Sequence, residues 1–308
     1  MGIALKKYKE TFIQRFDKDG FVPYLSYTDY EGLKQNKDSF INSRGNSVSY
    51  FLYNYNKYDK DKIILFLHGI GPGHTAYMSE IHNICIKGYQ VLTLDYSGCD
   101  SSGGENMYSI NSPTRDVVDL LNHLNLKQEI IVIGHSLGGY TALNILNIRD
   151  EITRGVVISG FYHIEREMRS FMKLRLLTSE VTRFERSVEP TYYQINNLKF
   201  LKDTNKKILF IHSKDDMVVP YKSSCLVIEK LHNPNLSFLV VDNKKHNPNY
   251  SLDAVNYMLD TFKVYNEMIK NHEFKNDNER KQWMNSKSLM RMTEQDQDVI
   301  DEIIEFIK

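Results

Sequence analysis

The sequence is poor in the residues that mark several common protein classes. Its 308 residues include three cysteines, seven prolines and one tryptophan. The cysteines, Cys85, Cys99 and Cys225, are odd in number and far apart, which argues against a disulfide framework. We therefore expect a reducing compartment and a cytoplasmic protein.

The sequence also has no net charge. The chain carries 39 Lys and Arg residues against 39 Asp and Glu residues, so no overall field attracts nucleic acid or an anionic membrane. No apolar run is long enough for a signal peptide or a membrane span. N-myristoylation of Gly2 would require Ser or Thr at position 6, which is Lys6 here. We expect no nucleic-acid partner and no membrane span.

The motifs that bind metals and nucleotides are missing as well. The sequence has no C-x-x-C and no His pair at helical ligand spacing with a Glu between. No G-x-G-x-x-G follows a predicted strand, and no phosphate-binding loop of the G-x-x-x-x-G-K-[ST] type occurs. We therefore expect neither a metal nor another cofactor.

What the sequence does contain is a regular alternation of apolar runs and helical patterns. Residues 39–42 and 47–55 alternate around R-G-N at 44–46, as in a hairpin. Short apolar runs predict buried strands at 62–67, 89–94, 129–133, 155–158, 207–211 and 236–241. Helical spacing predicts helices at 76–86, 112–124, after residue 136, at 221–231 and at 251–269. This alternation predicts an α/β fold with a mostly parallel twisted sheet covered by helices on both faces.

Three regions lie outside this alternation. Residues 1–36 predict a helical or irregular N-terminal extension. Residues 161–204 contain no clear strand and predict a helical cap or lid over the sheet, although a longer crossover would also fit. Residues 271–308 predict a charged linker and an amphipathic helix at 294–307, which docks on its own chain or pairs with another. The core would then comprise residues 37–160 and 205–270, with a possible homodimer through the lid or the C-terminal helix.

The most informative stretch follows the predicted strand at 129–133. Residues 134–138 read G-H-S-L-G and fit the G-x-S-x-G motif, with helical spacing from Tyr140 onward. A serine at a sharp strand-to-helix turn needs small neighbours, which Gly134 and Gly138 provide. Its hydroxyl would be exposed, and the N–H of Leu137 would point to where an oxyanion forms. We expect Ser136 to be a nucleophile.

Other predicted strands end in residues that could complete this site. Residues 68–73 read H-G-I-G-P-G, residues 95–102 read D-Y-S-G-C-D-S-S, and residues 216–220 read D-M-V-V-P. His246 follows the last predicted strand. An imidazole that removes the serine proton and a carboxylate that orients the imidazole would activate Ser136.

In combination these motifs resemble the α/β-hydrolase family over residues 39 to 270. The resemblance implies a triad of Ser136, Asp216 and His246 in that order, with an oxyanion hole made by the amides of Ile70 and Leu137. Two departures from the family's D-x-R-G-x-G-x-S stretch, Ser97 for arginine and Asp100 for glycine, affect loop support.

Each assignment has a rival. Asp215 adjoins Asp216, but Pro220 starts the next helix and favours Asp216 as the acid. Asp95 also ends a strand, yet it precedes the nucleophile in the chain, so a structural role is expected. Among the ten histidines, His68 and His212 would brace loops.

These residues predict a serine hydrolase that cleaves carboxylic esters or thioesters of small to medium acyl groups through an acyl-serine intermediate. The partner would be a small-molecule acyl substrate, with His74, Tyr77 and Tyr108 lining its pocket. An aminopeptidase, an acyltransferase with the same triad and a non-catalytic binding or scaffold protein are the alternatives.

Overall fold

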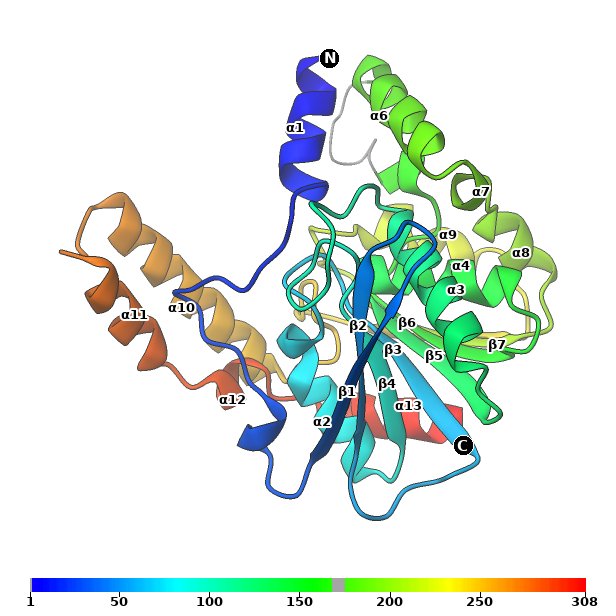
Figure 1. Ribbon diagram of the computed structural model, residues 1–308, viewed down its shortest axis with the longest axis horizontal. Coiled ribbons are helices and arrows are strands. Elements are labelled where there is room, and N and C mark those ends of the chain that lie inside the picture. The colour runs from blue at the N-terminus through cyan, green and yellow to red at the C-terminus, as the bar shows by residue number, and fades with distance from the viewer. Residues whose placement is uncertain (1, 168–174) are drawn as a thin grey trace.

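The computed structural model describes residues 2–167 and 175–308. Its centre is an eight-stranded sheet with the order β1-β2-β4-β3-β5-β6-β7-β8 (Figure 1). The strands are β1 (Lys34–Ile41), β2 (Ser47–Asn54), β3 (Lys62–Leu67), β4 (Gln90–Leu94), β5 (Glu129–His135), β6 (Arg154–Ile158), β7 (Lys207–Ser213) and β8 (Leu236–Val241). Strands β3 to β8 are parallel, and β1 and β2 add an antiparallel edge.

Helices cover both faces of this sheet because its parallel strands are apolar on both sides. Along β3, Ile63, Leu65 and Leu67 face one cluster of buried side chains, and Ile64 and Phe66 face the other. Helices α3 (Ser112–Leu124), α4 (Leu137–Ile148) and α9 (Cys225–Glu229) contribute to the first cluster. Helices α2 (Met78–Ile86) and α13 (Gln297–Ile307) contribute to the second. The predicted fold class is confirmed.

Most of the predicted strands and helices shift by one or two residues, and two elements differ most from the prediction. Strand β1 begins at Lys34, five residues before the predicted start, because it pairs with β2 along its whole length although most of its side chains are exposed. The helix predicted at 221–231 is a 3-10 turn, η3 (Tyr221–Ser223), followed by the short α9.

The described part of residues 161–204 is helical and lies between β6 and β7. It contains α6 (Arg175–Val188), α7 (Pro190–Tyr193) and α8 (Asn197–Asp203). Helix α1 (Ile3–Phe12) packs beside α6 above the sheet (Figure 1). The Tyr8 hydroxyl donates to Glu185 Oε1 over 2.6 Å, so the N-terminal extension and the insertion are joined by a buried hydrogen bond.

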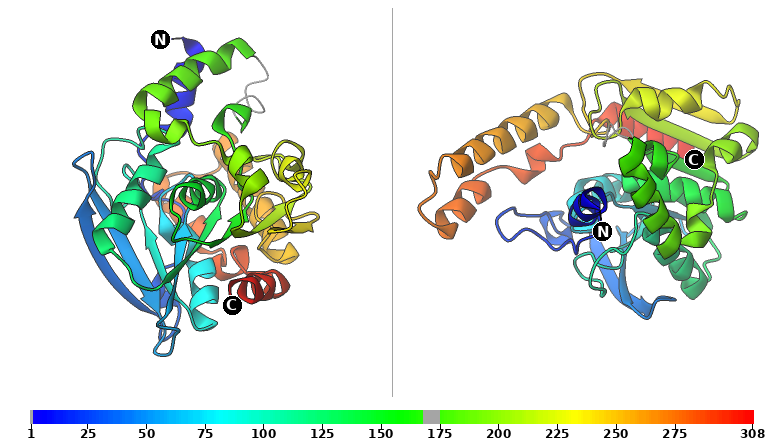
Figure 2. Two further views of the ribbon diagram at one scale, coloured as in Figure 1. Left: turned by 90° about the vertical axis from the view of Figure 1, so that its right-hand side faces the viewer. Right: turned by 90° about the horizontal axis from the view of Figure 1, so that it is seen from above.

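The region predicted as a charged linker is helical instead. Helix α10 (Leu252–Lys270) is followed by α11 (Asp277–Asn285) and α12 (Leu289–Met292), and α10 and α11 form an arm that projects from the sheet (Figure 2). Side chains of Asn276 and Ser288 cap α11 and α12, and the Trp283 ring stacks on Tyr265 of α10 at 5.8 Å. These caps stabilise both helices, and the aromatic contact stabilises α11, whose sequence is largely polar.

The C-terminal helix α13 docks on its own chain. Five of its apolar residues, Val299, Ile300, Ile303, Ile304 and Ile307, are buried in the second cluster. Its apolar face is therefore covered by its own chain, and a homodimer through the lid or the C-terminal helix stays a prediction. Among the described residues, no helix has the length and apolar character needed to cross a membrane.

Candidate active site

Ser136 lies at the turn between β5 and α4, in a backbone conformation that few L-residues adopt. Its φ is 56° and its ψ is −117°. Such a conformation costs free energy and persists only where the surrounding structure enforces it. The Ser136 N–H donates to the Ile158 carbonyl over 2.9 Å, which holds the turn to the end of β6.

The two glycines that flank Ser136 allow this turn to form. A Cβ atom at Gly134 would overlap the carbonyl of Gly138, and a Cβ atom at Gly138 would overlap the carbonyl of Leu67 at the end of β3. Any side chain at either position would therefore force backbone apart. The close packing of backbone at the two glycines places Ser136 at the first turn of α4, whose N-terminus carries a partial positive charge.

Asp216 and His246 form an acid–base pair at the ends of β7 and β8. The distance between His246 Nδ1 and Asp216 Oδ2 is 2.8 Å. Asp216 Oδ1 accepts hydrogen bonds from the amides of Val218 and Val219. Burial alone would raise the pKa of Asp216, but the His212 and His246 rings and the amides outweigh it and lower this pKa well below its ordinary value. Asp216 is thus ionised, so Nδ1 of His246 donates the hydrogen bond.

Asp215 points elsewhere. Its Oδ1 accepts from the Ser213 hydroxyl and from the Lys245 amide, and its Oδ2 lies 2.8 Å from Lys245 Nζ. Of the two adjacent aspartates, the structure brings only Asp216 to His246.

His135 connects the histidine loop to the serine turn. Its Nε2 lies 2.8 Å from the His246 carbonyl, and the two rings lie 4.8 Å apart. Burial, followed by the nearby His246, lowers the pKa of His135 to about 3, so this imidazole is neutral. Because only a protonated nitrogen can donate to a carbonyl, Nε2 carries the hydrogen and Nδ1 is an acceptor. The residue before Ser136 thus binds the backbone of the predicted base.

The loop after β3 passes directly beside Ser136. A Cβ atom at Gly69 would come within 3.2 Å of the Ser136 Cβ. The Gly69 amide donates to the Tyr77 hydroxyl over 3.0 Å, and this hydroxyl lies 2.9 Å from the acceptor Nδ1 of His135. A continuous chain of hydrogen bonds therefore runs from the loop that carries Ile70, through Tyr77 and His135, to the backbone of His246.

The loop at 95–102 is held by hydrogen bonds to residues elsewhere in the chain. Where the resembled pattern has an arginine, Ser97 donates to the buried Asp116. Arg15, from the N-terminal extension, donates to the carbonyls of Asp100, Ser102 and Gly104. Asp95 is buried and accepts from the amide and Nδ1 of His74, which is a structural role.

The residues predicted to line a substrate pocket lie in three different places. Only Tyr77 adjoins the serine turn, and its hydroxyl supports the loop rather than an open pocket. His74 is 1% exposed, and both of its ring nitrogens are occupied, by Asp95 and by the Tyr53 hydroxyl. Tyr108 contacts the β1–β2 hairpin through Asn46 and Arg44. The side chains of His74 and Tyr108 are therefore engaged in these contacts, and their role in a substrate pocket stays a prediction.

Comparison with known proteins agrees with this architecture. Residues 64–251, well over half of the chain, match the sequence model of the alpha/beta hydrolase family. The chain belongs to this family. An esterase of Pyrococcus furiosus has a similar solved structure, with a TM-score of 0.58 and 19% identity over 84% of this chain and 97% of that one. At this identity the likeness shows the fold alone.

Relatives with curated names match parts of this chain. The lysophosphatidylserine lipase of Gallus gallus is 27% identical over 52% of this chain and 44% of its own. The 2-hydroxy-6-oxo-6-phenylhexa-2,4-dienoate hydrolase of Comamonas testosteroni is 31% identical over 35% of this chain and 40% of its own. The chain thus spans less than half the length of these relatives.

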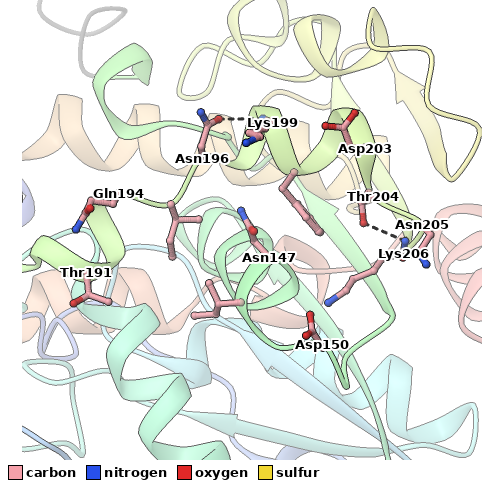
Figure 3. Close-up of a pocket in the computed structure, with 13 residues that line it drawn as sticks. Asn147, Asp150, Thr191, Gln194, Asn196, Lys199, Asp203, Thr204, Asn205 and Lys206 are labelled. Atoms are coloured by element: carbon pink, nitrogen blue, oxygen red, sulfur yellow. Dashed lines mark hydrogen bonds between the residues drawn. The ribbon is translucent and has the colours of Figure 1, made fainter.

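A hollow of about 670 Å³ lies elsewhere on the molecule (Figure 3). Its walls include Asn147 and Asp150 near the end of α4, Thr191 of α7 and Lys199 of α8. Asn147 is eleven residues from Ser136 along α4, which is about 16 Å at 1.5 Å per residue. The hollow therefore lies away from the carboxyl ends of the strands, where sites form in α/β sheets.

Sequence reasoning missed the part that Tyr77 and His135 play in joining the loops. The order of the motifs indicates which loops meet, but no pattern in the sequence indicates which side chains join them. Arg15 was also missed, since it lies in an extension that follows no motif.

Proposed function

We propose that this hydrolase cleaves carboxylic esters or thioesters through an acyl-Ser136 intermediate. The observation that carries the proposal is the Asp216–His246 pair, which His135 ties to the turn that bears Ser136. An ionised carboxylate on Nδ1 leaves Nε2 of His246 as the basic nitrogen. A strained serine beside such a base is the arrangement that nucleophilic catalysis requires.

The reaction would proceed in two halves. His246 Nε2 takes the proton of the Ser136 hydroxyl as its oxygen attacks the acyl carbon. The resulting oxyanion accepts hydrogen bonds from the amides of Leu137 and Ile70, each worth roughly 10²–10³ in rate. The imidazolium then protonates the leaving alcohol or thiol, and an acyl group remains on Ser136. Water, deprotonated by His246, attacks this acyl group and restores the serine.

The amide assignments rest on position in the fold. Leu137 is the first residue of α4, and the first N–H groups of a helix have no partner within it. Ile70 follows Gly69, whose backbone lies against Ser136. Two donors from different loops would then face the acyl oxygen.

We further propose that the insertion is a cap over this site. Phe161, Ile164 and Val181 pack in one cluster with Leu137 of the serine turn and Val219 of the acid loop. Tyr8 and Ile13 of the N-terminal extension belong to the same cluster, so α1 would be part of the cap.

Hydrolysis of nitrophenyl esters of increasing acyl length tests the reaction. Wild type should release nitrophenol, and Ser136→Ala should be slower by at least about 10⁴-fold. Ser101→Ala, at an exposed serine, is the control and should match wild type. Equal rates in wild type and Ser136→Ala would rule out the proposal.

A further inference from the structure

An apolar cavity of about 280 Å³ is walled partly by residues of segments outside the predicted core, 22–25 and 289–293. Residues 22–25 of the N-terminal extension form one wall, and Met258 and Phe262 of α10 form another. Met292 of α12 contributes as well. The cavity therefore lies where the base of the arm meets the N-terminal segment, which Arg280 of α11 also contacts through the Phe21 ring.

The remaining walls include residues that follow β3, whose loop passes beside Ser136, and a residue of the loop after β8, which contacts His135. Pro72 and Ala76 follow Ile70 in the loop after β3, and Tyr250 follows His246 in the loop after β8. Tyr77, whose hydroxyl supports Gly69, lies between the cavity residues Ala76 and Met78. A group bound in this cavity would thus contact the same loops that hold the proposed oxyanion donor and base.

The lining is uncharged, although a quarter of the chain's residues carry charge. Among the described residues that line the cavity, none is an Asp, Glu, Lys, Arg or His. Of its hydroxyl groups, those of Ser79 and Thr293 bind each other over 2.6 Å. Thr75 Oγ1 is buried without a partner among the described residues. Such a lining favours an uncharged, largely apolar ligand, because a buried charge would have no partner there.

The volume of the cavity also limits the size of the ligand. Pockets that enclose a drug-sized ligand have about 300–1,000 Å³, so this cavity falls just below that range. It suits a single hydrocarbon chain better than a bulky headgroup.

We propose that this cavity binds the hydrocarbon chain of the acyl substrate. The inference rests on the proposed acyl transfer to Ser136, and it adds that the substrate is a medium-chain aliphatic ester or thioester. The N-terminal segment and the arm would then set chain-length preference, although neither carries a proposed catalytic residue.

Filling the cavity tests this proposal. Met258→Trp should lower kcat/KM at least tenfold for nitrophenyl decanoate and leave nitrophenyl acetate unchanged. Leu259→Trp, at the next and exposed position of α10, is the matched control and should alter neither. Leu25→Trp fills the same cavity from the N-terminal wall and should reproduce the effect if Met258→Trp does not fold. An unchanged decanoate-to-acetate ratio in a folded cavity variant would overturn the proposal.

Binding without turnover separates this proposal from the proposed function. Ser136→Ala should bind ethyl decanoate in calorimetry, and the Met258→Trp variant made in that background should bind it at least tenfold more weakly. Equal binding by both would overturn the cavity assignment even if ester hydrolysis is established. Lost binding in the second variant, with no hydrolysis by wild type, would support the cavity and refute the reaction.

Discussion

At the scale of single residues, adjacent side chains of the same type have different environments. Asp215 and Asp216 are neighbours on the loop after β7, yet one binds Lys245 and the other binds His246. The sequence favours Asp216 as the acid because Pro220, which starts the next helix, fixes its distance from that residue. The opposite directions of the two carboxylates depend on the loop's conformation, which the sequence pattern does not specify.

This difference predicts unequal effects of the same substitution. Asp216→Asn should lower kcat for ester hydrolysis by about 10³–10⁴-fold, because the amide no longer stabilises the imidazolium or fixes its tautomer. Asp215→Asn should stay within a fewfold of wild type. Steady-state kinetics of both variants makes the test, and a larger loss in Asp215→Asn would contradict the assignment.

Tyr77 allows a second test at this scale. Tyr77→Phe removes the acceptor of the Gly69 amide and the donor to His135, each worth about 1 kcal/mol. We expect kcat to fall about tenfold with little change in KM. Tyr55→Phe is the matched control, since Tyr55 also contacts a histidine, His82, away from the site. A normal kcat in Tyr77→Phe would show that this chain of hydrogen bonds does not position the site.

At the scale of elements, burial decides what the sequence could predict. The central strand β3, the edge strand β8 and helix α3 have the predicted bounds, because apolar runs mark the strands and a proline in the first turn marks the helix. The first half of β1 and helix α11 are polar, and helix α12, which reads L-M-R-M, is too short to show a periodic signal. Strand β1 forms by pairing with β2, and α11 and α12 form through their side-chain caps and through contact with α10. Strand pairing and helix contact are tertiary effects, which a local sequence pattern does not show.

Helix α13 is the clearest case of an element held by burial. Ile303 is 2% exposed against the sheet, so Ile303→Ala should lower the free energy of unfolding by about 2–5 kcal/mol. Glu302→Ala, at the neighbouring exposed position, should change it by less than about 0.5 kcal/mol. Urea unfolding of the two variants measures both values. Equal stabilities would contradict the docking of α13.

At the scale of the whole molecule, a buried carboxyl links three distant parts of the chain. Glu80 of α2 accepts from Asn249, which follows β8, and Asn249 also binds Gln295 before α13. Burial raises the pKa of Glu80 to about 7 from an ordinary value of 4.5, so the folded state favours the protonated form.

This shift predicts how stability depends on pH. Between about pH 4.5 and 7 the folded state holds a proton that the unfolded state has lost. The stabilising contribution is therefore complete below pH 4.5 and is lost as the pH rises through 7, a change of roughly 3 kcal/mol. Glu80→Gln cannot ionise, so its stability relative to wild type should increase from pH 5 to pH 8. A constant difference across this range in urea unfolding would contradict the prediction.

The proposed function depends on Ser136 being an activated nucleophile. Labelling with a fluorophosphonate probe, followed by mass spectrometry of the labelled peptide, tests this most directly. We predict a single adduct on Ser136 in wild type, none in Ser136→Ala, and strongly slowed labelling in His246→Ala. A folded wild-type protein that takes no label, or a label that persists in Ser136→Ala, would contradict the account.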